Sequence, residues 1–251
     1  MGSYLGVDWA GTGWVAAVLS DETEPTVAFY PTVLNLWRDH AEAETILIDI
    51  PIGLREEGKR RCDVEAKSLL GPDRHRSVFL TPTREAVYAP NIEAAKEVQK
   101  PGNFGIQNQA WAIVPRIREV DGFLQHFSGS VAEDQILEAH PELCFAGLDG
   151  GQPMDHEKRS SEGAQERRSL LATHDSSLPA IFEEAVETLT KPDYAPMIGK
   201  TKRDDILDAL VLAYTAKVGA NEGFDRLPRE REGQQDTQLE RDVEIVYVTT
   251  G

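Results

Sequence analysis

Hydrophobic and polar positions alternate near the start of the chain around a short glycine-rich break. Residues 4–18 read YLGVDWAGTGWVAAV, with apolar residues on both sides of Gly-Thr-Gly. Glycine adopts turn dihedrals that other residues resist, so this pattern predicts two antiparallel strands joined by a tight turn. Asp8 stands near the end of the first predicted strand. An unpaired buried carboxylate is costly, so a carboxylate in this position requires a partner, a metal ion or water.

The next segments predict further strands and helices. Residues 26–30 (TVAFY) have the composition of a short strand, and residues 33–43 predict a helix. Residues 45–51 (TILIDIP) form a continuous apolar run, typical of a strand buried on both faces, and this run also ends at an acidic residue, Asp49. Another strand, carrying Glu138, is expected at 135–141.

The later helices are read from their apolar spacing. We expect helices at 162–171, 178–189 and 202–217, and the last of these follows the 3.6-residue period best. Residues 219–242 are polar and loop-like, and residues 243–248 predict a final edge strand.

Residues 55–130 interrupt this alternation. They are polar, irregular and rich in arginine, which predicts a helical subdomain inserted after the fourth strand. A hairpin and meander followed by alternating strands and helices describe a mixed α/β sheet. We therefore expect residues 1–251 to form one domain with this subdomain inserted within it.

Composition narrows the class of protein. The apolar runs are far shorter than the ~18–20 residues of a membrane span, and residues 1–6 lack the pattern of a signal peptide, so we expect a soluble cytoplasmic protein with no membrane partner. The two cysteines form no CxxC pair and the six histidines show no zinc-ligand spacing with them. We expect neither a disulfide nor a structural zinc.

The charge is strongly acidic. The net charge is -17, and arginines outnumber lysines 17 to 9. Two interpretations stay open: a halophilic source, in which high salt screens self-repulsion, and an ordinary acidic cytosolic protein. In either case overall charge would not attract nucleic acid, so such a partner requires a local basic patch or bound metal ions.

Four aspartates are the leading candidates for chemistry. Asp8 and Asp49 end predicted strands, and Asp205 and Asp208 lie three residues apart on one face of the late helix. Clustered carboxylates repel, so they bind hard cations or keep protons. Oxygen ligands favour Mg²⁺ or Mn²⁺, and two such ions about 3.5–4 Å apart can activate water against a phosphodiester.

Each of these aspartates has an ordinary alternative. An Asp at a strand end is commonly a turn or cap residue, and DDILDA, residues 204–209, could be a solvated helix face. Geometry alone also allows Asp204 to replace Asp205 in the pair. The order of two strand-end aspartates followed by DxxDA is more specific than any one of them.

The chain resembles the domain of unknown function 429 family, which comprises predicted nucleases with a ribonuclease H-like fold. The segments that carry the resemblance are GVDWAGTGWVAAV, ILIDIPIGL, RRCDVEAKSLLG, SVFLTPTREA, IQNQAWAIVPRIREVD, EAHPELCFAGL and DDILDALVLA. The resemblance implies a five-stranded mixed sheet whose first strand carries Asp8 and whose fourth carries Asp49, and a C-terminal helix with Asp205 and Asp208. The DxxDA pair is also similar to the corresponding helix of RuvC-type junction resolvases.

Other residues are secondary candidates. Glu138 would lie on a fifth strand next to the first and could be an additional metal ligand. Basic side chains that could contact phosphates include Arg60, Arg61, Arg76, Arg84 and Lys158. The alternative, slightly favoured, is that these cations form ion pairs with the abundant acidic residues.

The function expected from these residues is metal-dependent hydrolysis of phosphodiester bonds in nucleic acid. Two alternatives stay open. DWAGTG, residues 8–13, resembles the phosphate-binding turn of sugar kinases and actin-like ATPases, although no second hairpin of that kind is visible. The carboxylates could also form a structural metal site in a catalytically silent binding protein. The sequence leaves open RNA, DNA, hybrid or junction substrates, the number of metal ions and the oligomeric state.

Overall fold

The computed structural model describes residues 2–100, 104–191, 202–230 and 233–250, and the chain divides into two compact units. The first contains residues 1–49, 134–225 and 247–251, and the second contains residues 50–133 and 226–246. The insertion expected at 55–130 therefore falls within the second unit. The C-terminal segment of this unit was not expected there.

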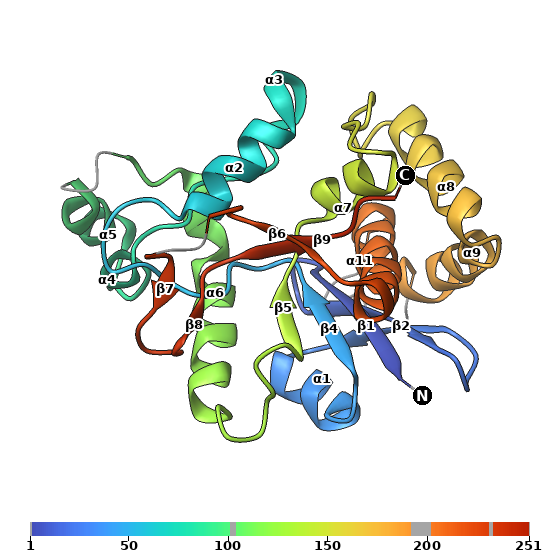
Figure 1. The fold of residues 1–251 in the computed structure, drawn as a ribbon, viewed down its shortest axis with the longest axis horizontal. Coiled ribbons are helices and arrows are strands. Elements are labelled where there is room, and N and C mark those ends of the chain that lie inside the picture. Colours follow the sequence, from blue (N-terminus) through green and yellow to red (C-terminus); the bar gives the residue numbers. More distant parts are fainter. Residues whose placement is uncertain (1, 101–103, 192–201, 231–232, 251) are drawn as a thin grey trace. The chain divides into compact units, whose positions relative to one another are not determined.

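The first unit is built on a five-stranded mixed sheet with the order β3-β2-β1-β4-β5. β1 runs antiparallel to β2 and parallel to β4, and β4 runs parallel to β5. This confirms the mixed α/β sheet. The five strands are β1 (Ser3–Trp9), β2 (Trp14–Ser20), β3 (Thr26–Tyr30), β4 (Thr45–Ile48) and β5 (Ile136–Glu138) (Figure 1).

The position expected for the fifth strand was wrong. β5 lies next to β4 and not next to β1, because the apolar strand β4 pairs with both of them. All four residues of β4 are buried, as is typical of a strand that is covered on both faces.

The predicted hairpin between β1 and β2 is confirmed. Trp9 pairs with Trp14, and the Ala10 amide donates a 2.9 Å hydrogen bond to the Gly13 carbonyl across the turn. Gly11 has a φ of 86°, a conformation that side chains with a Cβ rarely adopt. The Gly-Thr-Gly break therefore has the local role that its sequence indicates.

Five helices in the described part of the chain accompany this sheet. α11 packs on β1, β2 and β4 and also contacts α7, α8 and α9 (Figure 1). It continues past the expected end at residue 217, and its last buried residue is Gly219. The helices are α1 (Val33–His40), α7 (Pro141–Leu148), α8 (Ser161–His174), α9 (Leu178–Leu189) and α11 (Arg203–Glu222).

A glycine lets α11 lie directly on β1. A Cβ on Gly6 would come within 2.1 Å of the Ala209 carbonyl oxygen and the Ala213 amide nitrogen. Side chains alternate along a strand, so Asp8, two residues after Gly6, points to this same face of the sheet. The close approach therefore brings one end of α11 towards the end of β1 that carries Asp8.

The second unit contains short elements. β6 pairs with β9 and β7 pairs with β8, so the expected final edge strand does not join the main sheet. None of the described helices is long and apolar enough to span a membrane. The elements are α2 (Arg61–Leu69), α3 (Gly71–Arg74), α4 (Arg84–Val87), α5 (Ile92–Gln99), α6 (Asn108–His126), β6 (Asp225–Leu227), β7 (Gln235–Asp236), β8 (Arg241–Asp242) and β9 (Ile245–Tyr247).

Candidate carboxylate site

The parallel pairing of β1 and β4 places two aspartates side by side. Val7 pairs with Ile48, and the Asp49 amide donates a 2.9 Å hydrogen bond to the Val7 carbonyl. Asp8 and Asp49 follow these two residues directly. Because paired residues of parallel strands share a face, Asp8 and Asp49 both lie on the face that α11 covers.

The first turns of α11 add two more carboxylates to this face. Asp208 is 1% exposed and Asp205 is also buried. One Asp205 oxygen accepts a 2.9 Å hydrogen bond from the Lys202 amide, so this residue also caps its own helix. Asp204 instead lies 3.3 Å from Arg159 in an ion pair. The structure therefore brings together Asp205 and Asp208, the pair that the DxxDA spacing predicts.

The carboxylates influence one another electrostatically. Burial raises the pKa of Asp8 well above its usual value, and the charges of Asp208 and Asp49 raise it further. Burial likewise raises the pKa of Asp205. For Asp208, burial raises the pKa to about 6 although the neighbouring Lys158 opposes the shift. These mutual effects indicate that residues from β1, β4 and α11 face a common region.

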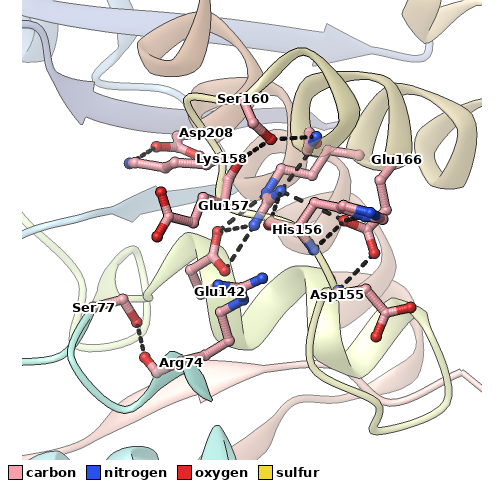
Figure 2. A network of polar contacts seen from close by, with 12 residues as sticks. Arg74, Ser77, Glu142, Asp155, His156, Glu157, Lys158, Ser160, Glu166 and Asp208 are labelled. Atoms are coloured by element: carbon pink, nitrogen blue, oxygen red, sulfur yellow. Dashed lines mark hydrogen bonds and ion pairs between the residues drawn. The ribbon is translucent and has the colours of Figure 1, made fainter.

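A lysine makes the closest contact to this group. The Lys158 ammonium lies 2.5 Å from one oxygen of Asp208 (Figure 2). The Asp208 charge raises the pKa of Lys158, and the Asp8 charge adds to this effect. Lys158 belongs to the segment between α7 and α8. Sequence reasoning considered it only for phosphate contacts, since no local pattern links it to a residue 50 positions away.

The turn that carries Lys158 is tied down by α8 (Figure 2). The Ser160 hydroxyl accepts a hydrogen bond from the Gly163 amide at 2.9 Å and donates one to the Glu157 carbonyl at 2.8 Å. The carboxylate of Glu166 accepts hydrogen bonds from two successive backbone amides of the turn, at 2.7 and 3.0 Å. The backbone on both sides of Lys158 is thus held in place.

A buried ion pair supports the same turn. Arg167 donates to both oxygens of Glu142 on α7 at 2.7 and 2.8 Å, and both side chains are almost fully buried. Arg167 also donates to the His156 carbonyl at 3.2 Å. This pair links α7, α8 and the Lys158 turn, and sequence reasoning missed it.

The donor chemistry of the site fits a hard divalent cation. One oxygen of the buried Asp208 has no hydrogen-bond partner among the described residues, and carboxylate oxygens are the ligands that Mg²⁺ and Mn²⁺ prefer. The arrangement is nevertheless not a closed metal site. Within residues 2–100, 104–191, 202–230 and 233–250, no three His, Cys, Asp or Glu side chains are grouped so as to hold one metal ion. Binding a cation would require the carboxylates to draw closer and Asp208 to be shared with Lys158 or released from it.

Glu138 does not join this group. It pairs with Ile48 in the parallel ladder between β4 and β5, so it lies on the opposite face of the sheet from Asp49. The two-residue period of a strand therefore argues against the expected role of Glu138 as an additional ligand.

Three of the candidate arginines of the second unit make ion pairs. Arg84 is buried between Asp121, at 2.9 Å, and Asp236, at 2.5 Å. Arg61 lies 3.2 Å from Glu230, and Arg60 is buried 3.5 Å from Asp63. Arg76 is exposed. For Arg60, Arg61 and Arg84 the contacts are those of the ion-pair alternative that the sequence slightly favoured.

Comparison with known proteins supports the resemblance. A family model described as "Protein of unknown function (DUF429)" matches residues 6–233. The chain belongs to the DUF429 family. Asp8, Asp49, Asp205, Asp208 and Lys158 all lie within the part matched by the DUF429 model. Searches among curated proteins and among solved structures give no match.

Proposed function

We propose that this DUF429 protein hydrolyses phosphodiester bonds of nucleic acid with the help of Mg²⁺ or Mn²⁺. The observation that carries the proposal is the buried Asp208, with one oxygen that lacks a hydrogen-bond partner in the described chain, on the same face as Asp8 and Asp49. The strand order β3-β2-β1-β4-β5, with its antiparallel hairpin and parallel neighbours, is consistent with a ribonuclease H-like fold. Fold alone does not define a reaction, so the proposal rests on the carboxylates.

In this proposal Asp8, Asp49, Asp205 and Asp208 would hold the cation. A bound divalent cation would supply an activated water and stabilise the leaving oxygen of the phosphodiester. The carboxylates would keep the site negative enough to retain the cation, and Asp205 would also keep the first turn of α11 in place through its hydrogen bond to the Lys202 amide. Because the protein carries a net charge of -17, a nucleic-acid substrate needs such a local positive charge.

Metal binding is the first test. Mn²⁺ at about 100 times its dissociation constant should stabilise the folded chain by roughly 2.7 kcal/mol if the unfolded chain does not bind it. Thermal unfolding is measured in Mn²⁺, Mg²⁺ and EDTA at fixed ionic strength. Asp8→Asn should lose most of the stabilisation because it removes a charged ligand. Equal melting temperatures of the unmodified protein in all three conditions would refute the metal dependence.

Cleavage is the second test. Labelled single-stranded RNA, duplex DNA, an RNA–DNA hybrid and a four-way junction are incubated with the protein in Mn²⁺. At least one should be cut by the unmodified protein and none by Asp8→Asn. Cleavage of equal rate by the Asp8→Asn protein would remove this residue from the site.

A further inference from the structure

The side chains of Lys158 and Asp208, which form an ion pair, differ in their exposure to solvent. The Asp208 side chain is 1% exposed, whereas the Lys158 side chain is 37% exposed. The carboxylate lies on a buried face of a long helix. The lysine ammonium sits on a flexible four-carbon stem that reaches solvent, so it is the partner that can leave.

The site holds more negative than positive charge. Asp8 and Asp49 both contribute to the field at the Lys158 ammonium, in addition to Asp208. The neighbouring Arg159 forms an ion pair with Asp204. One ammonium thus serves as the counter-charge of a group of carboxylates, as a divalent cation could do more fully.

The backbone that carries Lys158 is held in place by neighbouring contacts. Gly163 is required for the turn, because a Cβ there would lie 2.0 Å from the Glu157 carbonyl oxygen. The Ser160 hydroxyl, the Glu166 carboxylate and Arg167 fix the backbone around Lys158. A surface lysine that met Asp208 by chance would not need this support.

We propose that Lys158 is the internal counter-cation of the site and competes with a divalent cation for Asp208, so that metal binding displaces the ammonium from this carboxylate. This inference rests on the proposed metal dependence. In this arrangement Lys158 already engages one oxygen of Asp208, and the other oxygen is buried without a hydrogen-bond partner in the described chain.

The test compares Mn²⁺ affinity in three variants of the full chain. Lys158→Met and Lys158→Gln remove the competing charge and should bind Mn²⁺ about 10-fold more tightly, which corresponds to about 1.4 kcal/mol. Lys217→Met is the matched control. Lys217 lies on the same helix as Asp208, is paired with Asp21 at 3.0 Å, and has a side chain 36% exposed. Its loss changes the net charge equally and should leave the affinity unchanged.

Mn²⁺ affinity is measured at fixed ionic strength by titration followed with the electron paramagnetic resonance signal of free Mn²⁺. The inference is supported if both Lys158 variants bind Mn²⁺ more tightly than the unmodified protein and Lys217→Met does not. It is also supported if the Lys158 variants bind Mn²⁺ while the unmodified protein and Lys217→Met do not. If the unmodified protein binds Mn²⁺ and the Lys158 variants bind it equally or more weakly, the competition is wrong while the metal dependence stands. If no protein binds Mn²⁺, both proposals fail.

Discussion

Each unit contains a group of buried charges, and the carboxylates of the two groups differ in how completely they are hydrogen-bonded. In the second unit, Arg84 lies between two carboxylates whose hydrogen-bonding oxygens are well occupied. Asp121 accepts hydrogen bonds from Arg84, Tyr88 and Gln125. Asp236 accepts one from Arg84 and three from backbone amides, and the shortest of the three amide bonds is that of Leu54, at 2.6 Å. In the first unit, one Lys158 ammonium faces several carboxylates, and an oxygen of Asp208 has no hydrogen-bond partner among the described residues.

This difference separates a structural network from a site. A buried charge is tolerated when its hydrogen bonds are complete, and such a network holds segments together. A buried carboxylate oxygen without a hydrogen bond lowers the stability of the fold. Groups that destabilise a fold in this way are often found at binding and catalytic sites. The Arg84 Nε has no hydrogen-bond partner among the described residues and lies 3.6 Å from Glu56 in an ion pair, but the carboxylates of Asp121 and Asp236 are well hydrogen-bonded. We therefore assign the Arg84 network to stability and look for function at the Asp208 group, where a buried carboxylate oxygen has no such partner among the described residues.

The largest expected effect is on the hydrogen-bonded network around Arg84. Arg84→Met should reduce the free energy of unfolding by about 3–5 kcal/mol, because it leaves the buried carboxylates of Asp121 and Asp236 without their cation. Urea unfolding measures the loss. Arg76→Met, at an exposed arginine, is the control and should change stability by less than about 0.5 kcal/mol. Similar small changes in both variants would show that the network is not structural.

The next effect concerns activity at the Asp208 group. Asp208→Asn and Asp205→Asn should each slow Mn²⁺-dependent cleavage by about 100-fold or more, equivalent to roughly 2.7 kcal/mol of barrier. Asp204→Asn should keep most of the activity, because Asp204 is engaged by Arg159. Single-turnover cleavage rates of the three variants are measured, which compares Asp205 and Asp208 with Asp204 on the other side of α11. An inactive Asp204→Asn protein beside an active Asp205→Asn protein would reverse the assignment.

The smallest expected effect is a pH dependence of stability. Because burial raises the pKa of Asp8 in the folded state, the folded chain keeps a proton that the unfolded chain releases above pH ~4. Stability from this group is present at low pH and is lost as pH rises through the raised pKa. In EDTA, Asp8→Asn should therefore be more stable than the unmodified protein at pH 8, by on the order of 1 kcal/mol, and not at pH 4. Urea unfolding at the two pH values measures it, and a difference that does not grow with pH would contradict the proposed burial cost.

Local patterns determined much of the fold and part of the site. Turn glycines and apolar periods act over a few residues, so they were sufficient for the hairpin of β1 and β2, for β3 and for α9. The spacing of DxxDA placed Asp205 and Asp208 on one face because the helical period is fixed by backbone geometry. The family also followed from these same segments.

The tertiary structure decided which of these residues meet. Strand order and register placed Glu138 on the far face of the sheet, since a parallel partner is chosen by long-range packing and a shift of one residue reverses the side chain. Burial decided that Arg84 makes ion pairs, and residues 226–246 joined the second unit across more than 90 intervening positions. The ion pair between Lys158 and Asp208 was also decided by the tertiary structure. Attraction between opposite charges depends on their distance in space, which no periodic pattern in the sequence indicates.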